Sequence, residues 1–418
     1  MKRYRLRDEM NGIEEPPGKV WFWELAAGVI DADRCIQCGT CVAACPSNSI
    51  GVNKDSGLPE LVKMCTGCSL CWDFCPRGGL RYEALWPPSS VESDEAAVVR
   101  PDSSDPYWKI TGGPPAEGLG SVLQSYAVRS SARNDGVQDG GAVSALLIAL
   151  LNAGEINGAL VAKPSEDPEE PWKGVATVAR TPEEVLAASG SFYNQTMALA
   201  ELDLARYKLG PNPRIALVGT PCEIQGIRAM QSRRWQTGAH RIDSVVLTVA
   251  LLCTKSFDYE GLILRELRDR RRIDLDRVAK IDVIHGKMIV EYRDGQLAVD
   301  EPVKNFHGSA LKGCDECADF LGRSADISMG SVGSIAGWTS TIIRTERGLA
   351  AFERARGKLD VRSLDDPDAL VRLDRLDKRI ALRSLERPFD PDAPLFIDYE
   401  DHVRSYDGTE RRVMVTIR

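Results

Sequence analysis

The chain has 418 residues, 27% of them charged, and a formal net charge of -8. One hydrophobic core cannot serve a chain of this length, so two or three domains are expected. The acidic balance argues against nucleic-acid binding, which needs a basic face. No apolar run approaches the roughly 18 residues that a membrane-spanning helix needs, so we expect a cytoplasmic protein, either free or docked to a membrane complex.

Residues 1–29 are expected to form an N-terminal extension. Met1 begins a polar, charged stretch that lacks the apolar core of a signal peptide, which favours a reducing compartment. Trp21, Phe22 and Trp23 interrupt this polarity. We expect these aromatic side chains to pack against the domain that follows or against a partner.

Residues 30–85 carry one cysteine pattern twice, C-x2-C-x2-C-x3-C-P, the run that holds 4Fe–4S clusters in bacterial ferredoxins. The short gaps let three thiolates converge from one tight loop, which also turns backbone N–H groups toward the sulfurs. The eight cysteines are Cys35, Cys38, Cys41, Cys45, Cys65, Cys68, Cys71 and Cys75. Because such clusters move single electrons, this region predicts a redox protein.

The fourth cysteine of each run is expected to bind the cluster of the other run. One cluster is thus predicted on Cys35, Cys38, Cys41 and Cys75, and the second on Cys65, Cys68, Cys71 and Cys45. Gly39 and Gly67 are expected to relieve crowding beside the clusters. Zinc would leave the third cysteine of each run without a role, and disulfides would need a secreted context, so both are disfavoured.

Residues 86–118 are rich in Pro, Ser, Asp, Glu and Gly, which is typical of a linker or a surface loop. A larger domain is predicted over 119–386, followed by a tail over 387–418. Its strands and helices alternate along the chain, which predicts an α/β sheet with helices on both faces. Expected strands are Ser121–Arg129, Gly158–Ala162, Val175–Ala179, Arg214–Val218, Val245–Leu252, Ala325–Ile327 and Thr341–Arg344.

Helices are expected where apolar residues recur with helical spacing. One runs from about Ala142 to Asn152, and another begins after Thr181, which is a good N-cap because Pro182 and two glutamates follow it. Residues 279–300 predict a small antiparallel insert with a hairpin turn at Arg293-Asp294-Gly295. Helices alone are expected from the last strand to about residue 386.

Four cysteines outside the repeated runs form a second candidate redox site. Cys222 and Cys253 each follow a predicted buried strand, and Cys314 and Cys317 form a CxxC pair. Ligands of open α/β sheets bind at the carboxyl ends of strands, so the four thiolates could hold a third 4Fe–4S cluster there. The alternative, two ordinary buried cysteines plus a redox dithiol, is weighted equally on spacing alone.

Three glycine-containing loops are candidates for binding a phosphate or pyrophosphate. They are Asp139–Ser144, Gly219–Pro221 and Ser328–Gly333. A helix start offers free N–H groups and a favourable dipole to an anion, although a plain glycine turn explains each loop alone. Three of them in one domain favour a single extended ligand such as a flavin dinucleotide, which links single-electron clusters to hydride chemistry.

Five motifs in order resemble the beta subunit of coenzyme F₄₂₀-reducing hydrogenase and its dehydrogenase relatives. They are Gly140–Leu147, Gly219–Cys222, Cys314–Phe320, Ala325–Ser328 and Ile342–Thr345, and the resemblance covers roughly residues 118–355. It implies an α+β ferredoxin-like domain with two 4Fe–4S clusters, followed by a larger α/β domain that binds FAD and a third 4Fe–4S cluster. That third cluster would lie on Cys222, Cys253, Cys314 and Cys317.

The resemblance also implies where the flavin binds. Its site would be lined by Gly140, Gly141, Ala142, Val143, Ser144, Thr220, Pro221, Ser328, Gly330 and Gly333, with Tyr193 and Asn194 nearby. Two positions depart from the family pattern: Phe192 replaces a lysine, and Ser331 stands where many members carry aspartate. Lys304, Lys312 or Arg323 could instead supply charge to an acidic substrate, or could be ordinary surface residues.

The resemblance therefore implies an oxidoreductase that exchanges a hydride between coenzyme F₄₂₀ and FAD. Single electrons would pass through three 4Fe–4S clusters to or from a partner redox subunit or ferredoxin, and no catalytic nucleophile is expected. Two alternatives remain. One is a flavin reductase of a small organic substrate, fed by ferredoxin, and the other is a flavin-free subunit that only relays electrons.

Overall fold

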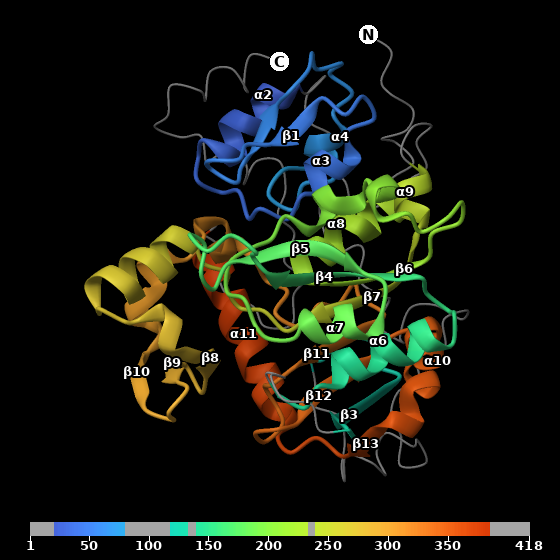
Figure 1. The fold of residues 1–418 in the computed structure, drawn as a ribbon. Helices are drawn as coiled ribbons and strands as arrows, with labels where there is room; N and C mark the ends of the chain where they lie inside the picture. The colour runs from blue at the N-terminus through green and yellow to red at the C-terminus, as the bar shows by residue number, and fades with distance from the viewer. Residues whose placement is uncertain (1–20, 80–117, 133–138, 233–238, 385–418) are drawn as a thin grey trace.

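The computed structural model describes residues 21–79, 118–132, 139–232 and 239–384. The expected C-terminal tail and most of the expected linker and N-terminal extension lie outside these ranges. In Figure 1 the ferredoxin-like part (residues 21–79, blue) lies above α8 (Pro221–Ser232), and the large domain (residues 118–384) extends below it. Within the described residues, no helix has the length and apolar character needed to cross a bilayer.

The ferredoxin-like part is built from two similar halves. Helices α3 (Thr40–Ala44) and α4 (Leu70–Asp73) each start after a residue with left-handed backbone, Gly39 and Ser69. Strands β1 (Ile50–Val52) and β2 (Pro59–Leu61) pair antiparallel between them. The helix α2 (Phe22–Leu25) continues into the π-helix η1 (Ala26–Ile30).

The aromatic residues before the first cysteine pack partly as expected. Phe22 and Leu25 are buried in the same core as the cysteines of this part. Trp23 is 42% exposed and stacks on Trp21, with ring centroids 5.8 Å apart. The prediction that this segment packs on the cluster domain is therefore confirmed for Phe22.

An eight-stranded mixed sheet forms the centre of the large domain, in the order β13-β3-β12-β11-β7-β6-β4-β5. Strands β4, β6, β7 and β11 run parallel, and the remaining neighbours pair antiparallel. The strands are β3 (Gln124–Ser130), β4 (Gly158–Pro164), β5 (Gly174–Ala179), β6 (Ile215–Gly219), β7 (Val245–Leu251), β11 (Ile327–Gly330), β12 (Thr339–Ile343) and β13 (Leu359–Arg362).

Helices cover both faces of this sheet. On one face, α6 (Ala142–Asn152), α7 (Pro182–Ala187) and α10 (Glu346–Ala355) bury apolar side chains against the strands. On the other lie α8, α9 (Ala239–Asp243), α11 (Pro367–Ser384) and the helices η3 (Ala198–Leu202) and η4 (Leu204–Tyr207). The ferredoxin-like part joins this second core through Ala43, Ala44, Leu70 and Phe74.

The strand directions bring the predicted ligand loops to one edge of the sheet. The parallel strands β4, β6, β7 and β11 all end there, and the antiparallel strand β12 begins there, since Gly330 pairs with Ser340. Strand β3 also ends at this edge, because Val128 pairs with Thr339. We call this edge the carboxyl edge.

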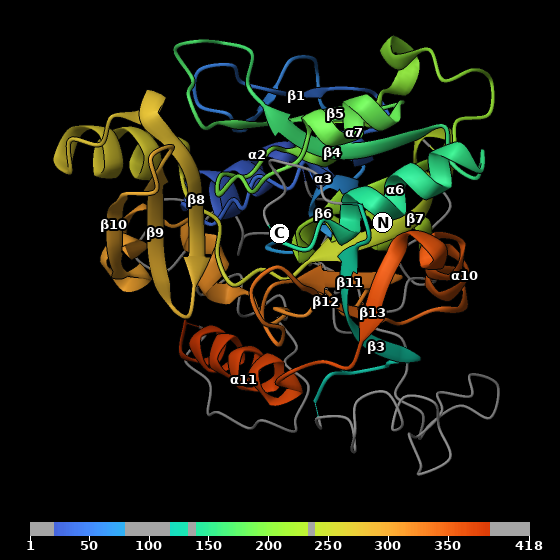
Figure 2. The same cartoon turned by 60° about the horizontal axis from the view of Figure 1, so that its bottom comes forward.

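A smaller module projects from the large domain, at the left in Figures 1 and 2. Its sheet contains β8 (Val278–Ile284), β9 (Lys287–Tyr292) and β10 (Leu297–Pro302), all antiparallel. The π-helix η5 (Glu260–Arg270) and the 3-10 helix η7 (Val303–Ser309) pack with this sheet around one apolar core. The predicted turn is present: Gly295 has φ +82° and donates its N–H to the Tyr292 carbonyl at 2.9 Å.

Two expectations about secondary structure were wrong in part. The strand expected at Ala325–Ile327 begins only at Ile327, so Ser328 and Gly330 lie inside a strand and not in a loop. Edge strand β13 interrupts the stretch expected to be helical, because residues 359–362 pair with β3. The π-helix η5 was not predicted from the sequence. The remaining short helices are η6 (Leu275–Arg277), η8 (Lys312–Glu316) and η9 (Arg356–Lys358).

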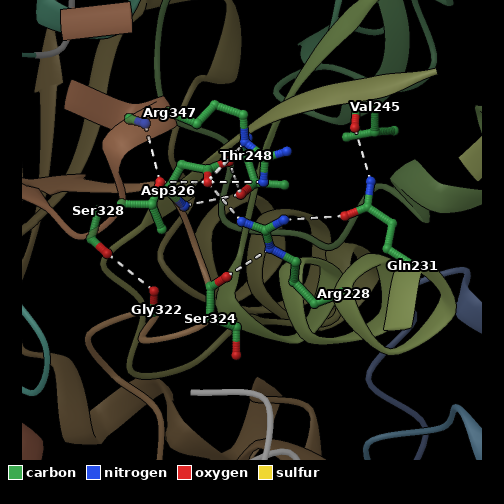
Figure 3. Close-up of polar contacts among 11 residues, drawn as sticks. Arg228, Gln231, Val245, Thr248, Gly322, Ser324, Asp326, Ser328 and Arg347 are labelled. Carbon is green, nitrogen blue, oxygen red and sulfur yellow. Dashed lines mark hydrogen bonds and ion pairs between the residues drawn. The ribbon is translucent and has the colours of Figure 1, made fainter. Parts of the chain in front are cut away.

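A buried carboxylate fixes the middle of the sheet to both helical layers (Figure 3). Asp326 is fully buried and accepts hydrogen bonds from the backbone N–H and the hydroxyl of Thr248 on β7, at 2.8 and 2.9 Å. It also pairs with Arg228 of α8 at 2.7 Å and with Arg347 of α10 at 3.0 Å. Burial opposes its charge, yet the two arginines hold the pKa of Asp326 below its usual value. Asp326 therefore fixes α8, whose first turn contains Cys222.

Candidate redox centres

Four cysteines of the ferredoxin-like part form what we call the inner set: Cys35, Cys38, Cys41 and Cys75. Burial is the main cause that raises the pKa of the Cys35 thiol and of the Cys75 thiol to about 12, and neighbouring thiols of the same set contribute to this rise. Cys41 lies within electrostatic reach of the other three. The structure therefore brings together one cysteine from the second run and three from the first, as crossed ligation requires.

The outer set consists of Cys45, Cys65, Cys68 and Cys71, which line one cavity. Burial raises the pKa of Cys71 well above its usual value, and the other three thiols of the set add to the shift. Cys65 and Cys68 are only partly buried, and the neighbouring Met64 is 82% exposed. The outer set thus lies beside an exposed side chain.

Backbone N–H groups point at several of these sulfurs, as the motif predicts. Gly67 donates to the Cys65 sulfur at 3.3 Å, Ser49 to Cys45 at 3.2 Å, and Arg77 to Cys75 at 3.4 Å. Such N–H···S bonds favour extra negative charge on sulfur and so tune the potential of a cluster. Gly39 also permits contact with the large domain, because a Cβ there would lie 2.6 Å from the Ala200 backbone nitrogen.

All twelve cysteines are free thiols. Within the described ranges, no three His, Cys, Asp or Glu side chains are grouped tightly enough to hold a metal ion. A four-iron cube binds each thiolate at a different iron, so its ligands are more widely spaced than those around one zinc ion, where each Zn–S bond is about 2.3 Å. The sets are therefore defined by shared surroundings and mutual electrostatic influence, and not by convergence on one point.

The remaining cysteines lie at the carboxyl edge, and we call them the sheet-edge set: Cys222, Cys253, Cys314 and Cys317. Cys222 and Cys253 follow the ends of adjacent parallel strands β6 and β7. Burial raises the pKa of the Cys253 thiol well above its usual value, and Cys314 and Cys317 raise it further. The structure thus brings a strand-end cysteine and the CxxC pair together, and Cys222 lies within electrostatic reach of Cys253.

Polar groups that the sequence did not reveal surround Cys222. The Thr220 hydroxyl lies 3.1 Å and the Gln195 amide nitrogen 3.5 Å from its sulfur. The buried Glu223 accepts hydrogen bonds from the backbone N–H groups of Thr220, at 2.8 Å, and Ala198, at 3.2 Å. Burial raises the pKa of Glu223 to about 7. These donors suit a sulfur that carries negative charge.

The inner set and the sheet-edge set lie against each other. Ile36, Cys38, Cys222 and Cys314 form one small buried cluster. After burial, Cys38 is the largest cause of the raised pKa of the Cys222 thiol. No such link to the sheet-edge set is found for the outer set within the described residues. The inner set therefore lies between the outer set and the large domain.

Two buried arginines of the ferredoxin-like part hold the CxxC segment. Arg34 makes a two-pronged ion pair with Glu316, with both N···O distances at 2.6 Å. Arg77 is 1% exposed and donates from Nε to the Gly313 carbonyl at 2.6 Å. Neither contact can be predicted from the sequence, because the paired residues are far apart along the chain.

The loop before α6 keeps the form expected of an anion site. Gly141 caps the helix with φ +66°, so the first N–H groups of the 11-residue helix point into the carboxyl edge. In the first turn, the Ser144 hydroxyl lies 3.3 Å from that of Ser189. The start of α6 therefore lies beside the segment that leads to Tyr193 and Asn194, and this helix start fits the pyrophosphate of a dinucleotide.

Several other predicted flavin residues use their side chains inside the protein. Asn194 bonds the backbone of Gly174 in both directions, at 2.8 and 2.9 Å. The Tyr193 hydroxyl donates to Asp282 at 3.1 Å and accepts from the Val283 N–H at 2.8 Å. These residues shape the edge around β5 and the small module, and their predicted contact with flavin remains a prediction.

The third predicted loop is tighter than expected. Ser328 is fully buried, where it donates to the Gly322 carbonyl at 3.1 Å and accepts from Arg344 at 3.0 Å. A Cβ at Gly330 would lie 2.7 Å from the Leu252 side chain. Gly333 has φ +92°, which suits glycine, and its carbonyl accepts two N–H groups from 365–366. The backbone of Gly330 and Gly333, and not the Ser328 hydroxyl, faces the edge.

The cations proposed to replace the missing lysine are not poised at this edge. Arg323 is buried and pairs with Asp374 at 2.8 Å. Lys312 pairs with Asp33 at the surface, and Lys304 is exposed on the small module. Phe192 packs closely against Gly174: a Cβ added to Gly174 would lie 2.6 Å from the Cβ of Phe192. Lys280 lies 2.9 Å from Asp282, which accepts a hydrogen bond from the Tyr193 hydroxyl, and this cation was not predicted from the sequence.

Comparisons with known proteins agree with this architecture. The two family models described as coenzyme F₄₂₀ hydrogenase/dehydrogenase beta subunit, N-terminal and C-terminal, match residues 125–203 and 212–367. A 4Fe–4S dicluster domain matches residues 28–81.

Several known proteins are similar to this chain. One subunit of the F₄₂₀H₂ dehydrogenase of Methanosarcina mazei is 28% identical, over 82% of this chain and 87% of its own length. The beta subunit of the coenzyme F₄₂₀ hydrogenase of Methanothermobacter thermautotrophicus is 33% identical, over 57% of this chain and 82% of its own length. The chain covers only 47% of a coenzyme F₄₂₀-dependent sulfite reductase from Methanocaldococcus jannaschii, at 29% identity over 79% of this chain. A chain of the F₄₂₀-reducing nickel–iron hydrogenase complex from Methanosarcina barkeri superposes with a TM-score of 0.59 at 28% identity, covering 63% of this chain and 91% of that chain.

Proposed function

Because this chain belongs to the coenzyme F₄₂₀ hydrogenase/dehydrogenase beta-subunit family and is an iron–sulfur oxidoreductase, we propose that it exchanges a hydride with coenzyme F₄₂₀ and passes electrons singly to a partner. The F₄₂₀H₂ dehydrogenase and hydrogenase relatives are named as subunits. A partner redox subunit or ferredoxin is therefore the expected second protein.

Three 4Fe–4S clusters would occupy the three cysteine sets. The inner and outer sets each offer four thiols from the duplicated motif. The sheet-edge set offers four more, two at strand ends and two on the CxxC segment. Burial in all three sets suits a cluster, because bound iron compensates the charge that an isolated thiolate could not carry.

FAD would bind along the carboxyl edge, with its pyrophosphate at the start of α6. The helix N–H groups at Ala142–Ser144 and the paired hydroxyls of Ser144 and Ser189 would hold the phosphates. The backbone at Gly330 and Gly333 and the side chain of Thr220 would line the remaining edge. When bound, this flavin would accept the two electrons of a hydride and release them singly.

The contact between Cys38 and Cys222 is the single observation that carries the proposal. It supports the order sheet-edge set, inner set, outer set, with each neighbouring pair close in space. Met64 and Thr66, beside the outer set, are exposed, which supports electron exit to the partner at that set. The same route serves the reverse direction.

A second function has a specific observation behind it: reduction of a small organic molecule by electrons entering from ferredoxin. Phe192 is packed on Gly174, and Arg323 is committed to Asp374. Phe192 thus gives no positive charge where the family pattern has a lysine, and Arg323, one of three cations that could replace that lysine, pairs with Asp374. A less acidic substrate would need neither.

One anaerobic experiment separates these functions. Iron and flavin are quantified in the purified chain, and F₄₂₀H₂ or reduced ferredoxin is then added while flavin and cluster absorbance are followed. The proposal expects about twelve irons and one FAD per chain and rapid bleaching by F₄₂₀H₂. Bleaching by reduced ferredoxin alone would support the small-molecule reductase, and about eight irons would show that the sheet-edge set holds no cluster.

A further inference from the structure

A buried arginine lies between two of the proposed clusters. Arg77 follows the last cysteine motif, and its guanidinium donates to the carbonyls of Gly313, at 2.6 Å, and Pro76, at 2.8 Å. One contact thus reaches the CxxC segment of the large domain, and the other stays beside Cys75. At 1% exposure, this charge is withdrawn from water and acts strongly on its neighbours.

The cysteines beside these contacts belong to two different sets. Pro76 directly follows Cys75 of the inner set, and Gly313 directly precedes Cys314 of the sheet-edge set. The backbone N–H of Arg77 also donates to the Cys75 sulfur at 3.4 Å. The cysteines of the outer set line a separate cavity.

The backbone at this junction leaves no room for adjustment. A Cβ at Gly313 would lie 2.0 Å from the Arg34 carbonyl oxygen, so the two segments touch directly. A Cβ at Gly226 of α8 would likewise lie 2.0 Å from the Thr40 hydroxyl. Arg77 therefore acts in a fixed geometry.

We propose that Arg77 is a positioning residue for electron transfer, which holds residues 313–317 against the inner set and favours the reduced state of the two flanking clusters with one fixed charge. Reducing a 4Fe–4S cluster adds one negative charge, so a buried cation beside it raises the potential. Because the cation lies beside two clusters, it raises the reduction potentials of both. The two potentials therefore stay close to each other, which allows electron transfer in either direction. This role rests on the proposed three clusters.

Arg34 provides the matched comparison. It bridges the same two segments through a buried ion pair with Glu316. Removing both partners, in Arg34→Gln/Glu316→Gln, deletes the bridge without changing the net charge. Arg77→Gln deletes a bridge and a charge together, whereas Arg77→Lys keeps the charge.

The test is a redox titration of the full-length, cluster-loaded protein followed by electron paramagnetic resonance. Arg77→Gln is expected to lower the reduced-to-oxidised ratio of two clusters about tenfold at fixed potential, or about 59 mV for one electron, and to leave the third unchanged. The double variant and Arg77→Lys should keep all three potentials. If Arg77→Gln does not retain its clusters, Arg77→Lys decides, because a tenfold shift in that variant contradicts the proposal.

Two outcomes would overturn the inference. Unchanged potentials in Arg77→Gln, or equal shifts in all three clusters, would show that the charge does not act at this junction. Fewer than about twelve irons in the unaltered protein would instead reject the three-cluster function. The iron count and the potentials therefore separate the two failures.

Discussion

The two cysteine runs of the ferredoxin-like part have the same spacing but different surroundings. The inner set is pressed against the large domain through Cys38, Ile36 and Gly39. The outer set opens into a cavity beside the exposed Met64. The repeated motif predicts the same chemistry twice, and only the tertiary contacts give the two sites different places in an electron path.

Removing one cysteine ligand from each set should give the largest difference between the inner and the outer site. Cys38→Ala should abolish electron delivery from flavin to both ferredoxin clusters, lowering turnover with the partner by about 100-fold or more. Cys68→Ala should lower that turnover as much, yet leave the inner cluster reducible by substrate. Rapid-mixing absorbance with iron counts checks this, and equal behaviour of the two variants would contradict the proposed order.

The large-domain side of the junction carries a buried carboxyl group that responds to pH. Burial, together with the charges of Asp374 and Asp315, raises the pKa of Asp377 to about 8, although Lys255 opposes the rise. The folded state therefore binds a proton that the unfolded chain releases near pH 4, and stability falls as pH rises toward 8. Asp377→Asn should remove this fall and add roughly 2–4 kcal/mol at pH 8.

Anaerobic denaturation between pH 5 and 8 measures that slope. The control is Asp368→Asn, an exposed residue of the same helix α11. It should leave the slope of the unaltered protein in place. A slope that survives in Asp377→Asn would show that another group is responsible.

Close packing between residues 313–317 and the ferredoxin-like part should give the next largest effect. Gly313→Ala puts a Cβ within 2.0 Å of the Arg34 carbonyl oxygen, and such overpacking costs about 1–3 kcal/mol. Gly308→Ala is matched, since a Cβ there meets nothing within 4 Å. Gly313→Ala should lower stability and slow transfer between the sheet-edge and inner clusters, while Gly308→Ala should do neither. Normal transfer in Gly313→Ala would argue against direct contact.

Hydroxyl groups beside the two sets provide the finest comparison. Thr40 is fully buried, 3.2 Å from the Cys38 sulfur, whereas Thr66 bonds the Cys68 sulfur from an exposed position. Thr40→Val should lower the reduced fraction of the inner cluster by less than tenfold, under about 59 mV. Thr66→Val should change the outer cluster less, because water replaces the lost donor. A redox titration measures both shifts. A larger shift of the outer cluster in Thr66→Val than of the inner cluster in Thr40→Val would contradict this comparison.

Local patterns predicted the elements well. The apolar spacing of Ala142–Asn152 predicted α6 with the bounds observed, and the Thr181 cap is present, with its hydroxyl 3.2 Å from the Glu184 nitrogen. The placement of Cys222 and Cys253 after neighbouring strands also follows from their positions in the chain. These predictions depend on residues close in sequence, whose geometry short-range chemistry fixes.

Long-range contacts could not be predicted. Arg34 and Glu316 are separated by 282 positions, and nothing in either neighbourhood names the other. Gly226 and Gly313 look like ordinary helix and loop glycines until the opposing backbone is in place. Ser328 was expected to face a ligand, but the strand starts two residues later than expected and buries its hydroxyl. One sequence without its tertiary partners does not contain these facts.

Magnetic coupling between reduced clusters tests the central claim, that the inner set is the neighbour of the sheet-edge set. Cys68→Ala should retain the inner and sheet-edge clusters, and Cys38→Ala should retain the outer and sheet-edge clusters. Electron paramagnetic resonance of both fully reduced variants compares the pairs directly. Strong interaction broadening in Cys68→Ala, with independent signals in Cys38→Ala, is the result expected. Broadening in Cys38→Ala alone would contradict the account, because it would place the outer cluster next to the large domain.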